Sequence, residues 1–175
     1  MTMAEATYRI RKSFLVPLGI DVLLLFVLLF LSLVYKGSGT ERAFLAFFSI
    51  GSLLIFLEAQ NRKITISDSG IALKKLLKLR ELLWSDITHV GSLKVRSRVY
   101  ILLTTKKGFH IISNAYDSFG ALAGDIIRHL DTEKIEVEAE AREQMEKPTQ
   151  NISDLVAVWI AAVVLIVILY MKFIL

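Results

Sequence analysis

The chain has 175 residues, of which 54% are hydrophobic, and its mean hydropathy of +0.56 is too high for an ordinary water-soluble protein. Its formal net charge is +4 and it has no cysteine, which excludes disulfides, thiolate catalysis and cysteine-bound metal centres. This length allows one modest extramembrane domain beside any membrane spans, and the positive charge suits an anionic surface as a neighbour.

The N-terminal third predicts a helical hairpin in a membrane. Residues 1–13 form a basic N-terminus, and the apolar segments 14–35 and 43–60 follow it, separated by the short polar turn 36–42. A membrane-spanning helix needs about 20 apolar residues. The first segment is too long for the apolar core of a signal peptide, and no small-residue cleavage pattern follows it. We therefore interpret it as a retained span.

A third apolar segment, residues 151–172, predicts one more span near the C-terminus. Lys and Arg are concentrated in the N-terminus and in the region after the second span, whereas the 36–42 turn carries only Lys36 and Arg42. The positive-inside rule then predicts a multi-pass inner-membrane protein with a cytoplasmic N-terminus and central domain and an external C-terminus.

Asp21 is an acid inside the first predicted span. A carboxylate at the bilayer centre costs about 2.5–3.5 kcal/mol on the insertion scale, so such a residue is a candidate functional site. The alternative is a structural role, in which the carboxylate is paired or directed toward the interface.

Between residues 61 and 132 the hydrophobic period changes from that of helices to that of strands. Ile64 and Ile66 alternate with polar residues, and the turn Asp68-Ser69-Gly70 follows, in which Gly70 is expected to supply a positive φ. The pattern predicts about six or seven short, locally connected antiparallel strands. An amphipathic helix follows, with Asn114 as its expected N-cap and an apolar stripe that includes Phe119, Leu122 and Ile126.

The segment ITISDSGIALKK, the later segment ELLWSDITHV, a hairpin and a terminal helix together resemble the bacterial pleckstrin-homology-like (PH-like) domain of small membrane proteins. The matching element of that family is carried here by Leu83, Trp84, Ser85, Asp86 and Ile87, with Leu83 where the family often has proline. The resemblance covers about residues 62–131. It implies an antiparallel β-sheet or barrel capped by a helix, and a tendency to self-associate or to serve in membrane assemblies. The expected class is thus an α+β membrane protein.

Trp84, Ser85, Asp86 and Ile87 are interpreted as structural. The tryptophan is expected in the core or at its rim, with Ser85 and Asp86 fixing a turn through side-chain bonds to the backbone. The three histidines, His89, His110 and His129, lack metal-site spacing, and no nucleophile motif or phosphate-binding loop accompanies them. We therefore expect no enzyme activity, no cofactor, no metal and no nucleic-acid partner.

Basic residues give the strongest functional signal. Residues 62–128 include twelve Lys and Arg but only five Asp and Glu. The candidates for contact with an anionic surface are Lys74, Lys75, Lys78 and Arg80 in one hairpin, and Lys94, Arg96 and Arg98, expected on one face of a single strand. Each cation near an anionic leaflet contributes about 1 kcal/mol. The alternative is a solvated sheet edge, which lysines commonly protect.

Residues 133–150 form an acidic linker for which alanine and glutamate favour a helix. It is either a solvated connector or a segment that folds back onto the basic surface.

The leading hypothesis for the whole protein is a non-enzymatic, membrane-anchored interaction module whose PH-like domain binds a protein partner, a second copy or the anionic inner leaflet. The alternative is an accessory subunit of a transporter, channel or other membrane complex that acts through its spans.

Overall fold

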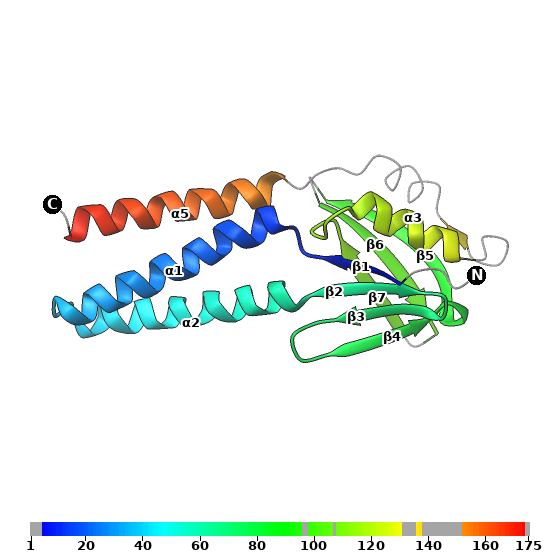
Figure 1. Cartoon of the computed structure of the whole chain (residues 1–175), viewed down its shortest axis with the longest axis horizontal. Helices are drawn as coiled ribbons and strands as arrows, with labels where there is room; N and C mark the ends of the chain where they lie inside the picture. Colours follow the sequence, from blue (N-terminus) through cyan, green and yellow to red (C-terminus); the bar gives the residue numbers. More distant parts are fainter. Residues whose placement is uncertain (1–4, 96–97, 107, 131–135, 138–151, 174–175) are drawn as a thin grey trace. The chain divides into compact units, whose positions relative to one another are not determined.

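The computed structural model describes residues 5–95, 98–106, 108–130, 136–137 and 152–173. The chain forms two compact units, each considered by itself (Figure 1). The helical unit comprises Lys12–Gln60 and Ser153–Leu175, and the β unit comprises Met1–Arg11 and Asn61–Ile152. The predicted α+β class is confirmed.

The helical unit consists of α1 (Lys12–Val34), α2 (Gly39–Asn61) and α5 (Ile152–Phe173). All three are long and apolar enough to cross a membrane. At 1.5 Å per residue, a 23-residue helix such as α1 or α2 is about 35 Å long, slightly more than a bilayer's hydrocarbon core. The predicted segments and the observed helices differ by only a few residues at each end.

Polar contacts at one end of the helical unit define how its helices run. The Ser32 hydroxyl donates a hydrogen bond to Oε1 of Glu41 at 2.7 Å, and Glu41 also forms an ion pair with Lys172. These contacts bring the end of α1, the start of α2 and the end of α5 together. Consequently α2 runs antiparallel to both α1 and α5.

The β unit contains two open sheets, antiparallel except for the short strand β8. The first has the order β1-β2-β3-β4, formed by Ala6–Arg9, Lys63–Ser67, Gly70–Lys74 and Leu79–Leu83. The second has the order β7-β6-β5-β8, formed by Gly108–Ser113, Arg98–Thr105, Ile87–Val95 and Glu136–Val137, with β8 parallel to β5. Neither sheet closes into a barrel.

Strand β1 belongs to the β unit although it precedes the helical hairpin in sequence. It pairs with β2 from Ala6↔Ile66 to Arg9↔Lys63. Beyond it, the Asp117 N–H donates to the Arg9 carbonyl at 2.7 Å, and Ile10 is buried. The helical hairpin is thus an insertion between two neighbouring strands, whereas the sequence had indicated only a basic N-terminal segment.

Alternation of buried and exposed residues builds the core as the sequence predicted. Ile64 and Ile66 of β2 are buried, as are Val99, Ile101 and Leu103 of β6. Helix α3 (Phe119–His129) adds the buried side chains of Phe119, Leu122, Ala123 and Ile126. The predicted apolar stripe is therefore confirmed.

Three local predictions were wrong. Helix α3 begins at Phe119, and its N-cap is Ser118 instead of Asn114, which is buried in the preceding loop. Gly70 does not have positive φ; among the described glycines, only Gly108 does. In the acidic linker, Glu136 and Val137 form a strand instead of a helix, and the rest of the linker lies outside the described residues.

Candidate functional site

A row of three cations crosses the first sheet on its outer face. In register, Arg9 lies opposite Lys63, and Lys63 lies opposite Lys74. Directly opposed residues of antiparallel strands project from the same side, about 5 Å apart, and like charges placed in this way repel one another. Among the described residues, no acidic side chain forms an ion pair with any of the three. Within the described part of the chain the row therefore carries an uncompensated positive charge, which a bound anion would neutralise.

This row lies where the sheet joins the helical hairpin along the chain. Arg9 is three residues before the first residue of α1, and Lys63 is two residues after the last residue of α2. At no more than about 3.5 Å per residue, both cations lie within roughly 10 Å of a helix end. The covalent connections alone therefore keep these two cations near the ends of two candidate membrane spans.

The β3–β4 hairpin turns at the same end of the first sheet. Its tip has the sequence Lys75-Leu76-Leu77-Lys78 and is closed by a hydrogen bond from the Lys75 N–H to the Lys78 carbonyl at 2.8 Å. Leu77 is 90% exposed, and neighbouring Leu79 is also exposed. Apolar side chains between lysines suit a membrane interface, where the leucines enter the acyl boundary and the lysines meet headgroups. We call this surface the basic rim, and it comprises Arg9, Lys63, Lys74, Lys75, Leu76, Leu77 and Lys78.

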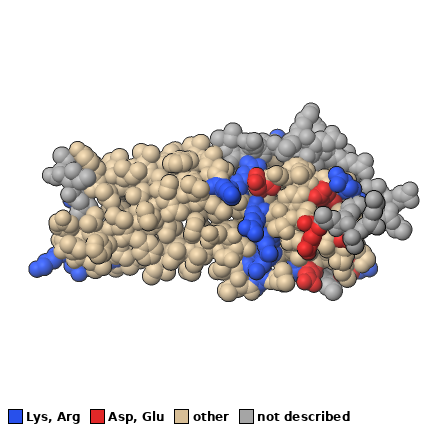
Figure 2. Space-filling model, in the orientation of Figure 1, with Lys and Arg blue, Asp and Glu red and all other residues tan. Residues whose placement is uncertain are grey.

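Figure 2 shows Lys and Arg side chains gathered in a band on the face in view.

The pKa of His110, on β7, is affected by the positive charges of the β3–β4 hairpin. Burial lowers the pKa of its imidazole first, and the positive charges of Arg80 and Lys75 lower it further. Arg80 lies opposite Leu73, on the face of the first sheet away from the cation row, so the predicted group of four hairpin cations is divided between two faces.

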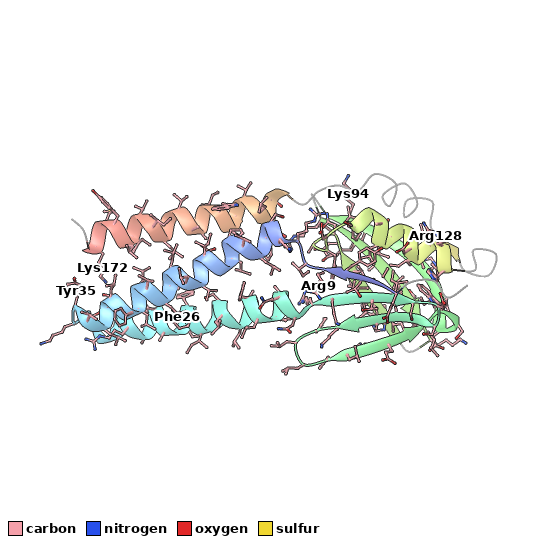
Figure 3. All side chains as sticks on the ribbon, viewed as in Figure 1. Arg9, Phe26, Tyr35, Lys94, Arg128 and Lys172 are labelled. Atoms are coloured by element: carbon pink, nitrogen blue, oxygen red, sulfur yellow. The ribbon has the colours of Figure 1, made fainter. Side chains whose placement is uncertain are left out.

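Lys94, Arg96 and Arg98 do not share one face of a strand, so that prediction was wrong. Lys94 is in β5 and Arg98 begins the separate strand β6, and Arg96 lies outside the described residues. Lys94 lies opposite Val99 and Arg98 opposite Val95, so the two cations project from opposite faces. Figure 3 shows Lys94 and Arg9 toward one end of the β unit and Arg128 toward the other.

Trp84 has the structural surroundings expected of it. It begins a short 3-10 turn (Trp84–Asp86), and its indole N–H donates to the Ser67 carbonyl at 2.9 Å. Its ring stacks on the imidazole of His129, with centroids 5.1 Å apart and planes at 9°. Ser85 is exposed, whereas Ile87 is buried at the start of β5. The predicted side-chain bonds of Ser85 and Asp86 to the backbone are not found among the described residues. The Asp86 carbonyl instead accepts a hydrogen bond from the Lys106 N–H, which follows β6.

Asp21 is buried in α1, with 7% of its surface exposed. Its Oδ1 atom has no hydrogen-bond partner among the described residues, and neither has the buried hydroxyl of Ser49 in α2. The carboxylate is thus enclosed by the protein instead of being presented to a second protein in the bilayer.

A polar pocket in the β unit was not anticipated. Its volume is about 240 Å³, and it is lined by Ala6, Ile66, Ser67, Asp68, Asp125, Arg128 and His129. The lining comes from β1, from the end of β2 with the turn that follows it, and from α3, which are far apart in sequence. The only sequence signal was the placement of Asp125, Arg128 and His129 on one helix face at i, i+3 and i+4. Across the described residues, no group of three or more His, Asp or Glu side chains is arranged to hold a metal ion.

Comparisons with known proteins give no assignment: no protein-family model matches the chain, and no match was found among curated proteins or among solved structures.

Proposed function

We propose that this protein is a non-enzymatic, membrane-anchored interaction module whose β unit contacts the anionic inner leaflet through the basic rim. The observation that carries this proposal is the coincidence of a cation row, which has no acidic partner among the described residues, with an exposed leucine tip at one end of the first sheet. That end is also the one that continues into α1 and α2. Because the helices already anchor the chain, leaflet contact would orient the β unit instead of recruiting it.

The order of elements supports a PH-like character for the β unit. A strand–turn–strand opening, the tryptophan turn, a three-stranded antiparallel meander and an amphipathic helix follow one another along the chain. This is the order that the sequence resemblance implied. Domains of that kind serve as binding modules, which agrees with the proposed role.

The alternative function, an accessory subunit acting through its membrane helices, has less support. Such a role would be best served by a polar side chain facing lipid, where another helix could bind it. Asp21 is instead enclosed by the protein. The cytoplasmic placement of the β unit follows from the positive-inside rule and is part of this proposal.

The proposal is tested with a fluorophore on the hairpin tip. Because the chain contains no cysteine, Leu77→Cys introduces a unique site for an environment-sensitive dye in the full-length protein. In vesicles containing anionic lipid the dye should shift to shorter wavelength and be quenched by acyl-chain quenchers. Neutral vesicles should give a smaller response. Added salt should weaken the effect, because exposed charges are screened over about 8 Å at physiological ionic strength.

Two variants serve as controls. Ser69→Cys labels an exposed turn at the opposite end of β2 and β3, and its dye should report water in both kinds of vesicle. Replacing Arg9, Lys63 and Lys74 with glutamine should reduce the anionic-lipid response of the Leu77 dye. Equal signals from the Leu77 dye in neutral and anionic vesicles would refute leaflet contact and leave a protein as the partner of the basic rim.

A further inference from the structure

The polar pocket contains a hydrogen-bond acceptor to which no described residue donates. Nδ1 of His129 lies 2.8 Å from the Asp125 carbonyl oxygen, and because a carbonyl can only accept, Nδ1 must carry the proton. In the neutral imidazole, Nε2 is then a lone-pair acceptor. This atom is buried and has no hydrogen-bond partner among the described residues.

A carboxylate oxygen close to this acceptor is also an acceptor. Oδ1 of Asp68 lies 3.9 Å from Nε2 of His129, which is too long for a direct hydrogen bond. One nitrogen placed between them can donate to both, because each N–H bond to an acceptor spans about 2.9 Å. The gap therefore fits one nitrogen that carries at least two N–H bonds.

The charges of the pocket favour a cation in that gap. Asp125 is already satisfied, since it accepts a hydrogen bond from the Tyr8 hydroxyl at 2.5 Å and pairs with Arg128 at 3.4 Å. Burial and the bond to Asp125 raise the pKa of Tyr8 to about 12, so its hydroxyl remains a donor at neutral pH. With His129 neutral, the half-exposed carboxylate of Asp68 has no cationic partner among the described residues that line the pocket.

We infer that the pocket binds a primary ammonium group, which donates hydrogen bonds to Nε2 of His129 and to the carboxylate of Asp68. Trp84 holds the imidazole in place by stacking on it, and the Asp125 carbonyl fixes its tautomer. The ammonium belongs either to a small free amine or to a lysine side chain, and both suit a cavity of about 240 Å³.

This site is separate from the basic rim. Asp68 follows the last residue of β2, whereas Lys63 of the rim is the first residue of that strand. Ammonium binding therefore does not depend on leaflet contact, and either proposal can fail while the other holds.

The test uses Trp84 as the reporter, because its ring is stacked on His129. The chain has two tryptophans, so Trp159→Phe leaves Trp84 as the only one in the full-length protein. Methylammonium should produce a saturable change in Trp84 fluorescence. Tetramethylammonium, which has the same charge but no N–H donor, should not. A parallel titration with Nα-acetyl-lysine amide separates the two sources: binding at least tenfold tighter than that of methylammonium would identify a lysine side chain, and equal binding a small amine.

Matched variants locate the response. Asp68→Asn and His129→Gln should each weaken binding at least tenfold, whereas Glu81→Gln, an exposed acid on β4 outside the pocket, should leave it unchanged. Because Asp68 lies in an exposed turn, its variant is expected to fold normally. Equal responses to the two methylated ammonium ions, or undiminished binding by Asp68→Asn, would overturn the inference.

Discussion

Gly70 shows how a single residue can be required for a reason other than its backbone angles. A Cβ atom built at this position would lie 2.0 Å from the carbonyl oxygen of Leu82, so β3 and β4 can pair only without a side chain here. Gly70→Ala should therefore destabilise the β unit by about 2 kcal/mol or more. Pulse proteolysis in urea on the full-length protein measures this effect on the folded β unit.

The matched control is Gly124→Ala in α3, where nothing lies within 4 Å of the new Cβ. Alanine is the better helix former, so this variant should gain up to about 1 kcal/mol. If both substitutions destabilise the β unit equally, steric contact with Leu82 is not the reason for Gly70.

His110 gives the β unit a predictable response to acid. Its pKa is lowered in the folded state by burial first and then by Arg80 and Lys75, so the folded protein binds this proton less readily than the unfolded chain. The contribution to stability is fully present above the unfolded value of 6.5 and is lost as pH falls from there through the lowered pKa. We expect the free energy of unfolding to be lower at pH 5.5 than at pH 7.5.

Arg80→Gln removes one of the two positive charges, so it should reduce this loss between pH 7.5 and 5.5 without abolishing it. His110→Gln should remove the His110 contribution altogether. Arg128→Gln, which changes a cation that does not act on His110, should keep the wild-type difference. An acid response identical in His110→Gln and the wild type would show that His110 does not contribute.

At the scale of elements, β1 should be necessary for the β unit to fold. Ile10, which follows β1, is buried and bridges to Tyr116, so Ile10→Ala should cost about 2–4 kcal/mol. Thr7→Ala, on the exposed side of β1, should cost much less.

Thermal unfolding of two soluble fragments gives a second measurement of the contribution of β1. Residues 61–132 alone should melt less cooperatively than the same fragment with residues 5–11 attached through a flexible linker. Indistinguishable melting of the two fragments would show that β1 is dispensable.

The elements that the sequence predicted are those with a strong local period. The sequence predicted the three apolar helices, the β2–β3 hairpin and the apolar stripe of α3, because each has its hydrophobic pattern within a short window. Strand β1 could not be predicted, because it is only four residues long and its pairing is not local. Ala6 pairs with Ile66, and the whole helical hairpin α1–α2 lies between them in the sequence. The sequence did not predict that β5 ends at Val95 and β6 begins at Arg98, because no glycine, proline or asparagine lies at residues 95–98.

The candidate sites follow the same rule. Lys74, Lys75 and Lys78 were found because they are neighbours in sequence, whereas the row of Arg9, Lys63 and Lys74 exists only through strand register. The polar pocket likewise requires β1, a turn and α3 to meet. Tertiary pairing supplied both arrangements, and one sequence without its fold does not contain that information in a local pattern.

At the scale of the whole molecule, the distribution of cations along the chain bears on orientation. At the end where α1 meets α2, Lys172 is paired with Glu41, and the Arg42 guanidinium donates to the Gly37 carbonyl at 2.9 and 2.6 Å. The opposite helix ends connect to the β unit and are flanked along the chain by Arg9, Arg11, Lys12, Arg62 and Lys63. The larger group of cations therefore accompanies the β unit, which favours its retention in the cytoplasm.

Single cysteines test this orientation directly, because the native chain has none. The contacts among Ser32, Glu41 and Lys172 place the end of α5 beside the α1–α2 loop, so both should lie on the same side of the membrane. In intact cells, a membrane-impermeant maleimide should label Ser38→Cys and a cysteine added after Leu175. Ser69→Cys and Ser97→Cys should react only after the membrane is permeabilised. External labelling of Ser69→Cys and Ser97→Cys with protection of Ser38→Cys would place the β unit outside, and the basic rim would then face the outer leaflet.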